Sequence, residues 1–371
     1  MAAMSAAAVL RPPSARPLAV ANWLLTLCGL IFVMVIVGGI TRLTESGLSI
    51  TEWKPISGAI PPLTEADWQR ELELYRQIPE YQQINRGMSL DEFKFIYFWE
   101  WVHRQLGRVI GLAALIPLLW FLAKKAIPDG YKLRTASIFV LVCIQGAIGW
   151  WMVASGLTER TDVSHLRLAV HLLVALFIFG LALWIALDLR TAGAVRQKVP
   201  TLAIWAFAIL GLQLLFGAYV AGLNAGHAFN SWPLMGEEIY PSGAPWLEPA
   251  LRNLVDNPIT VQFIHRWLAF GVLAMAILLA ARVKRVGGRR ESLFLHSAVG
   301  IQILLGIWTL VSGVSFHVAV AHQGMATLVV AAFVAAAHRL ALAEAAALPS
   351  PRTNEEDVRP FPLVPSEAEG R

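Results

Sequence analysis

Eight long apolar stretches set the class of this chain. An α-helix rises about 1.5 Å per residue, so about 20 apolar residues are needed to cross a bilayer. The stretches run roughly over residues 18–40, 98–123, 136–155, 166–187, 202–223, 259–281, 292–312 and 318–341. Hydrophobic residues make up 57% of the chain and charged residues 15%, a composition typical of integral membrane proteins. The sequence therefore predicts an all-α integral membrane protein with eight transmembrane helices.

Positively charged residues orient these helices. They concentrate after the second, fourth and sixth stretches, at Lys124, Lys125, Lys132, Arg134, Arg190, Arg196, Lys198, Arg282, Lys284, Arg285, Arg289 and Arg290. Because short loops rich in Lys and Arg stay in the cytoplasm, we expect these connections to be cytoplasmic and the loops 43–97 and 224–258 to lie outside. Arg11 and Arg16 place the N-terminus inside, and an even helix number returns the C-terminus there. The net charge of +5 thus reflects topology, and nucleic-acid binding is not expected.

The chain also repeats itself. Three motifs of the first half return in the second: Glu100 to Arg104 as Gln262 to Arg266, Ile144-Gln145 with Gly149 as Ile301-Gln302 with Gly306, and Val170-His171 as Ala321-His322. Such a repeat indicates two tandem four-helix bundles. The expected parts are a cytoplasmic tail (1–17), a first bundle (18–190) with the outer loop 43–97, a cytoplasmic linker (191–200), a second bundle (201–342) and a cytoplasmic tail (343–371) whose composition predicts disorder.

Four histidines recur at one depth of this repeat. They are His103, His171, His265 and His322, one on the second and one on the fourth helix of each half. Each lies about one to two turns from the outer end of its apolar stretch. An imidazole within a bilayer needs a partner, and ring nitrogens from facing helices are suitable axial ligands of haem iron. The pattern predicts two haems, one per pair. Arg104 and Arg266, beside the ligands, either pair with haem propionates or only snorkel to the interface.

The plainer interpretation of each feature differs. A single membrane histidine is more often a hydrogen-bonded interior residue, so the haem prediction depends on the fourfold pattern. The absence of Cys or carboxylate clusters beside these histidines in the sequence argues against zinc. Cys28 and Cys143, within the first and third stretches, are expected to be structural thiols. A structural role is also expected for the remaining histidines, His165, His227, His296, His317 and His338.

One acid separates the two halves. Glu100 lies three residues before His103 and therefore on the same helical face, whereas its counterpart Gln262 has the same shape but cannot ionise. A carboxyl group in a partly desolvated site can act in proton transfer; the alternative is that Glu100 only pairs with Arg104. The asymmetry suggests a reactive first half and a second half with a resident, electron-handling haem.

Two segments carry a family resemblance: residues 38–62, GGITRLTESGLSITEWKPISGAIPP, and residues 98–108, FWEWVHRQLGR. With the Glu-x-x-His spacing they resemble haem A synthases, over about residues 20–342. The resemblance implies an oxidoreductase that converts the methyl group at ring position 8 of haem O to a formyl group, giving haem A for cytochrome oxidase.

The resemblance also implies roles. His103 and His171 would hold the substrate haem, His265 and His322 would be the axial ligands of a resident haem b, and Glu100 would be the catalytic acid. The protein would be multi-pass in the bacterial inner membrane, with haem O as substrate and haem O synthase and cytochrome oxidase assembly factors as candidate partners; homo-oligomerisation is left open. The outer loops lack paired cysteines, as in the branch of proteobacteria and mitochondria.

Two rival functions use the same ligands. A dihaem b-type electron-transfer protein usually places its haems on opposite sides of the membrane, whereas these histidines share one side. A haem-delivery protein would not need Glu100. In the loop 43–97, capping-box spacing predicts two short helices, one after Thr64 and one after Ser89 that continues into Glu100. This loop is expected either to cover the first haem or to pack as an ordinary surface.

Overall fold

The computed structural model describes residues 15–191 and 198–347, and within them eight helices are long and apolar enough to cross a bilayer. They are α1 (Pro17–Leu43), α4 (Leu90–Ala123), α5 (Lys132–Ala154), α6 (His165–Arg190), α7 (Thr201–Gly222), α8 (Pro258–Arg285), α9 (Arg289–Val311) and α10 (Phe316–Ala347). Each predicted stretch falls on one of them, which confirms the all-α membrane prediction. The expected positions of Arg11, Arg196 and the tail 348–371 lie outside the described residues.

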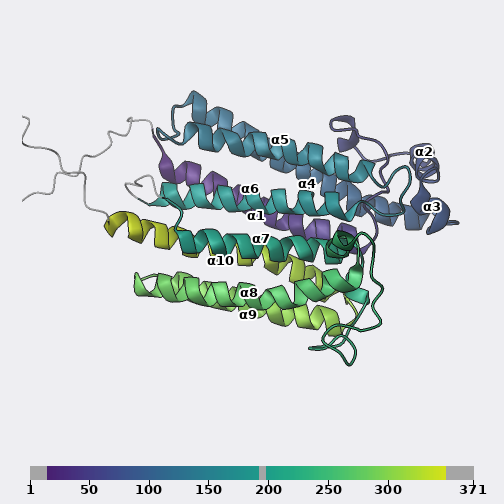
Figure 1. Cartoon of the computed structure of the whole chain (residues 1–371). Helices are drawn as coiled ribbons and strands as arrows, with labels where there is room; N and C mark the ends of the chain where they lie inside the picture. Colours follow the sequence, from purple (N-terminus) through teal and green to yellow (C-terminus); the bar gives the residue numbers. More distant parts are fainter. Residues whose placement is uncertain (1–14, 192–197, 348–371) are drawn as a thin grey trace, which may run out of the picture.

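The spanning helices form two neighbouring rings. In one, α1 contacts α4 and α6, and α5 closes the ring between them; in the other, α7 contacts α8 and α10, and α9 closes the ring. The rings meet where α6 contacts α7 and α10, and where α1 contacts α10, as Figure 1 shows. At this seam a Cβ on Gly180 of α6 would lie 3.5 Å from the side chain of Val334 on α10, and a small residue here lets the helices approach closely, as is usual in membranes.

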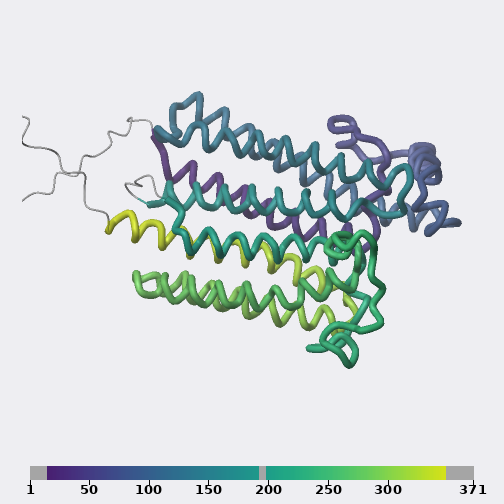
Figure 2. Tube along the Cα trace, viewed as in Figure 1, coloured from purple at the N-terminus to yellow at the C-terminus, as the bar shows by residue number. Residues whose placement is uncertain are grey.

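All long connections lie at one end of the molecule. Figure 2 shows both ends of the described chain at the opposite end, together with the short α4–α5 and α8–α9 connections. We call the end with the connections 44–89 and 223–257 the loop end, and the other the terminal end. The basic connections therefore share the terminal end, as the charge pattern predicts.

The first connection contains α2 (Glu65–Tyr75) and α3 (Pro79–Gln83), and short 3-10 helices occur at Ser57–Ala59, Ala225–His227 and Ala250–Leu254. Both predicted capping boxes are confirmed: the side chain of Thr64 starts α2, and that of Ser89 starts α4. Because Ser89 lies before the apolar stretch, α4 begins outside it and continues through Glu100. The sequence did not predict α3, whose five residues begin at a proline.

Polar contacts at the terminal end also join the rings. Asp188 on α6 is 5% exposed. One of its carboxylate oxygens lies 2.9 Å from His338 Nε2 on α10, and the other forms a 3.2 Å ion pair with Arg134 on α5. A buried carboxylate requires such partners. Cys28 is buried and Cys143 is exposed, and both are free thiols.

Candidate functional site

The four predicted histidines lie on four different helices toward the loop end. His103 is on α4 and His171 on α6, which stand opposite each other in the first ring; His265 on α8 and His322 on α10 stand opposite in the second. Each imidazole is half-buried. The fold thus places one histidine pair in each ring, on the helices that the sequence predicted.

The second pair is spaced as two ligands of one metal ion would be. The ring centres of His265 and His322 are 6.5 Å apart and their planes are perpendicular. A metal–imidazole bond is about 2 Å long and a ring nitrogen lies about 1 Å from its ring centre, so one iron atom between two imidazoles requires a separation of about 6 Å. The observed distance therefore fits a haem iron held by this pair.

A backbone carbonyl fixes the ring of His265. Its Nδ1 lies 3.2 Å from the carbonyl oxygen of Gln213 on α7. A ring N–H donated to a carbonyl selects one tautomer and leaves the other nitrogen for the metal, which is how metal-binding histidines are commonly oriented. This contact leaves Nε2 of His265 for a metal ion.

A glycine on the neighbouring helix faces each of the four imidazoles. A Cβ atom at these glycines would stand only 2.9 to 3.4 Å from a ring atom. The pairs are Gly38 with His103, Gly149 with His171, Gly217 with His265, and Gly306 with His322. Any larger side chain would press against the ring, so these glycines set the positions of the imidazoles.

Three glutamines complete the support of the histidines. Each donates from its Nε2 to the backbone carbonyl of a histidine: Gln145 to His171 at 2.8 Å, Gln213 to His265 at 3.1 Å, and Gln302 to His322 at 3.1 Å. Each glutamine precedes its glycine by four residues, one helical turn. The sequence analysis noted two of these Gln-x-x-x-Gly motifs as repeats but gave them no role, and it missed the third, on α7. The spacing relative to the histidines is the signal that could have found them.

Glu100 is held by the first connection. Its carboxylate is 2% exposed; one oxygen accepts 2.7 Å hydrogen bonds from Ser49 Oγ and the Ile50 N–H, and the other accepts from Arg104 at 2.6 Å. Arg104 also donates to the backbone carbonyls of Ile50 and Glu52. Glu100 and Arg104 therefore bind the first connection to α4. Glu100 lies three residues before His103.

The second ring repeats this clamp without the acid. Arg266 donates to Gln262 Oε1 at 3.1 Å and to the carbonyls of Phe229, Ser231 and Leu234. The amide of Gln262 in turn donates to the Phe229 carbonyl at 3.0 Å. A neutral glutamine thus suffices to hold the loop, so loop attachment alone does not require the charge of Glu100.

Comparison with known proteins gives one family. A family model described as cytochrome oxidase assembly protein matches residues 21–334. The chain is 53% identical over 329 residues to the haem A synthase of Sphingopyxis alaskensis, covering 88% of this chain and 93% of that protein. It is 51% identical to that of Rhizorhabdus wittichii over 334 residues, 88% and 96% of the two chains, and 48% identical to that of Rhodospirillum centenum over 345 residues, 91% and 92%.

The chain belongs to the haem A synthase family. The recognition made from residues 38–62 and 98–108 is therefore confirmed.

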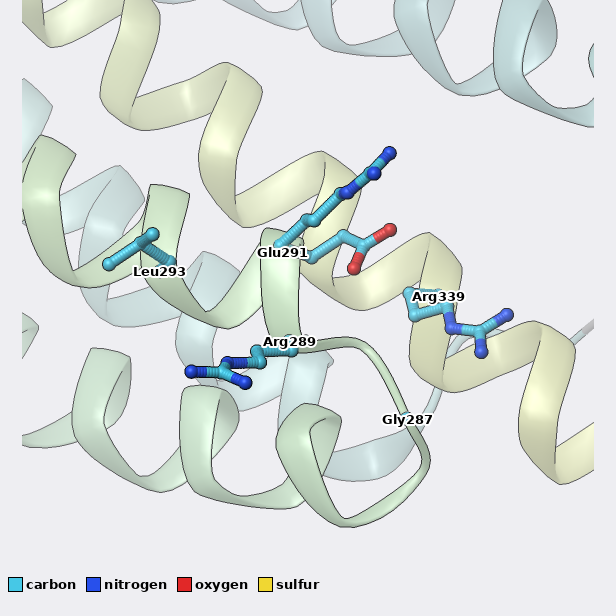
Figure 3. A pocket seen from close by; sticks show the side chains of 6 residues that line it. Gly287, Arg289, Glu291, Leu293 and Arg339 are labelled. Atoms are coloured by element: carbon cyan, nitrogen blue, oxygen red, sulfur yellow. The ribbon is translucent and has the colours of Figure 1, made fainter.

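In this haem A synthase family member, a shallow cavity of about 440 Å³ lies at the terminal end, away from the ligand pairs. It is lined by Gly287, Arg289, Arg290, Glu291, Leu293 and Arg339. Figure 3 shows the side chains of Arg289 and Arg339 extending in different directions. None of the four histidines lines this cavity.

The histidines that were expected to be structural make local contacts. His338 contacts Asp188 as described above, and His165, 5% exposed, lies 3.4 Å from Asp256. His296 Nδ1 lies 2.8 Å from the Ser292 carbonyl on its own helix. His227 lies in the 3-10 helix Ala225–His227, and His317 is the second residue of α10. None of the five faces a ligand pair in these contacts.

Proposed function

We propose that this protein oxidises the methyl group at ring position 8 of haem O to the formyl group of haem A, for use by cytochrome oxidase. Family membership over most of the chain supports the reaction. The observation that carries the assignment to a site is the difference between two otherwise matching clamps: Arg104 binds Glu100, whereas Arg266 binds Gln262. Of the two clamps only the first contains a carboxyl group, and on this basis we assign the chemistry to the first ring.

The two rings would then be two tandem bundles with different haems. The second would hold a resident haem b between His265 and His322, which the 6.5 Å ring separation supports. The first would hold the substrate haem between His103 and His171. Haem iron supplies the redox chemistry when bound; the protein supplies axial nitrogens, orientation and proton transfer.

Glu100 is fixed in position to take up or give a proton. Ser49, Ile50 and Arg104 hold its two carboxylate oxygens, so the group cannot swing away from the face that carries His103. A positioned general acid or base of this kind accelerates a reaction by about 10²–10⁴-fold.

The first connection covers this part of α4. Arg104 lies over the ring of Trp150 on α5, with 5.9 Å between its guanidinium carbon and the ring centre, and Trp53 stacks on the same ring at 5.6 Å. Arg108 donates to the carbonyls of Lys54 and Pro55. These contacts support a role of the loop in excluding water from the first ring.

The proposal also covers the two arginines, the location of the protein and its partners. The guanidinium groups of Arg104 and Arg266 donate to loop carbonyls and to the residue one turn earlier. A haem propionate could bind Arg266 at Nε, which is buried and without a partner among the described residues. We place the protein in the bacterial inner membrane with both termini and the terminal end in the cytoplasm, from the charge bias. Haem O synthase would supply the substrate and cytochrome oxidase assembly factors would receive the product.

Haem analysis tests the function. In a bacterial strain that makes haem O but lacks its own haem A synthase, expression of this protein should produce haem A, measured by extraction, chromatography and mass spectrometry, and an empty vector should not. Cells without haem A, together with purified protein that contains only b-type haem, would contradict the oxidation and favour an electron-transfer or delivery role.

A further inference from the structure

Part of the first connection is apolar and uncovered. Segment 53–63, WKPISGAIPPL, contains Lys54 as its one charged residue. Four large apolar side chains in it are more than half exposed: Trp53 53%, Ile56 87%, Ile60 68% and Leu63 76%. Exposed apolar side chains that gather in one short segment mark a surface for an apolar partner. The proposed reaction does not use the three aliphatic ones.

The segment is held on the side of α4. Arg108 donates 2.8 Å hydrogen bonds from Nη2 to the Lys54 carbonyl and from Nε to the Pro55 carbonyl. Gln105 donates to the Ala59 carbonyl. Segment 53–63 therefore lies alongside the part of α4 that contains these two side chains, and not beyond the start of the helix.

This part of α4 lies at membrane depth. α4 ends at Ala123, and the ammonium group of Lys124 lies 5.0 Å from the ring centre of Trp120, a pairing typical of the membrane interface. Arg108 is 124 − 108 = 16 residues from Lys124 and Gln105 is 124 − 105 = 19, or about 24 and 28 Å along the helix. Because the hydrocarbon core is about 30 Å thick, both residues lie near the boundary between acyl chains and headgroups at the loop end.

Tryptophans mark the same level on the neighbouring helix. Trp53 stacks on Trp150 of α5 with 5.6 Å between ring centres. The next residue, Trp151, is 47% exposed, and the guanidinium carbon of Arg167 lies 4.7 Å from its ring centre. Trp151 is 151 − 132 = 19 residues from Lys132, the first residue of α5, which is again about 28 Å. Trp53 therefore belongs to an aromatic belt of the kind that membrane proteins place at the interface.

The backbone of the segment is suited to this depth. Backbone that enters an apolar layer must find its hydrogen bonds within the protein. The N–H groups of Gly58, Ala59 and Ile60 donate within the segment, and positions 61 and 62 are prolines, which have no N–H. The carbonyls at positions 54, 55, 56, 57 and 59 all accept hydrogen bonds. The turn at 54–60 thus has protein partners for most of its carbonyls.

The second ring lacks the donors that hold this segment. In the repeat, Trp267 stands in place of Gln105, and Phe270 stands in place of Arg108. Phe270 is 47% exposed, and Trp232 of the second connection stacks beside it with 6.4 Å between ring centres. A guanidinium group in an apolar stretch is costly unless it has partners, and the carbonyls of the segment supply them for Arg108. The docked segment is therefore particular to the first ring.

We propose that segment 53–63 is inserted into the loop-end leaflet, at the boundary between headgroups and acyl chains, with Ile56 and Ile60 in contact with the acyl chains. Elements at this boundary bury their apolar side chains about 5–10 Å deep. The apolar surface continues on α4, where Leu112, one turn after Arg108 on the same face, is 54% exposed. The partner is thus the lipid that surrounds the bundle. The inference goes beyond the proposed reaction and does not depend on it.

Depth measurements with spin labels test the insertion. A label is attached at Ile56→Cys or Ile60→Cys in a Cys28→Ala, Cys143→Ala background, which removes the two native thiols. The full chain is reconstituted into vesicles of phosphatidylethanolamine and phosphatidylglycerol. Electron paramagnetic resonance then measures how often each label collides with oxygen, which concentrates among the acyl chains, and with a nickel chelate, which stays in water.

Two reference labels give the scale. Leu112→Cys lies on the lipid-facing surface of α4, and a lipid-like value there shows that the bundle is correctly inserted. Glu73→Cys lies on α2, where the side chain is 59% exposed. We expect the oxygen-to-nickel collision ratio at Ile56→Cys and Ile60→Cys to be well above that at Glu73→Cys and close to that at Leu112→Cys.

Two results would overturn the insertion. A ratio equal to that at Glu73→Cys would place the segment in water. Low collision rates with both reagents would show that a second copy of the chain or another protein covers it. The side chain of Ile56 is the most exposed of the four, so its replacement removes few contacts and the test does not depend on the folding of the Ile60→Cys protein.

Discussion

At the residue scale, the imidazole of each candidate haem ligand lies against a glycine of a neighbouring helix. Gly217 on α7 and Gly306 on α9 face His265 and His322 in the same manner. In a bundle core a flat ring can be placed accurately only if its neighbours are rigid. A helix backbone without a Cβ meets this need and allows the ring to come close.

Replacement of Gly217 by alanine should therefore displace a ligand. The new Cβ would stand 2.9 Å from His265 Cε1, so the ring must move, and we expect Gly217→Ala to lose most of its b-haem. Gly211→Ala is the matched control on the same helix, because its Cβ would meet no heavy atom within 4 Å and it gains the same helix propensity. Haemochrome spectra per mole of protein measure the difference. Equal haem content in the two variants would show that the close contact is unimportant.

The four histidines could be singled out as candidate ligands because their spacing repeats along the chain. The glycines that face them could not, since a glycine on another helix is matched to a histidine only once helix rotation is known. Glu100 was found as an asymmetry of the repeat, but its contacts with Ser49 and Ile50 depend on how the first connection folds back. No local sequence pattern predicts that the first connection folds back onto α4.

At the element scale, the spanning helices follow from apolar length, and two helix starts follow from capping boxes. The helix α3 was missed because its five residues carry little intrinsic preference and are held by tertiary contacts; Pro79 and Glu80 within it are buried. Opposite helices of each ring then carry one candidate ligand each, α4 with α6 and α8 with α10. The same pairing in two rings gives two sites that can differ in task.

If the rings are specialised, removal of ligands should have different effects. His265→Ala and His322→Ala should strip the resident haem b from the purified protein, because each leaves iron with one axial nitrogen. His103→Ala and His171→Ala should keep most of it, since the substrate site is in the other ring. The pyridine haemochrome spectra of the four variants give the haem b content, and a uniform loss across all four would mean that the rings are not specialised.

At the scale of the whole molecule, the termini and the short basic connections share one end, and the ligand pairs lie toward the other. We expect the terminal end to face the cytoplasm, because Arg289 and Arg290 begin α9 directly after its short connection to α8. A reporter enzyme that works only in the cytoplasm should therefore be active when it is fused after Arg290. Activity of a reporter that works only outside would reverse the orientation and place both haems near the cytoplasmic surface.

The central claim is that Glu100 makes the first ring reactive. Gln262 shows that a glutamine fits beside the clamping arginine, so Glu100→Gln should fold and should keep its b-haem. In a strain that lacks its own haem A synthase, this variant should accumulate haem O and make haem A about 10²–10⁴-fold more slowly than the wild type. The control is Glu73→Gln, a change at an exposed acid of α2 that pairs with Arg76, and it should match the wild type. Haem A formation by Glu100→Gln at a near wild-type rate would contradict the claim and reduce Glu100 to the ion-pair partner of Arg104.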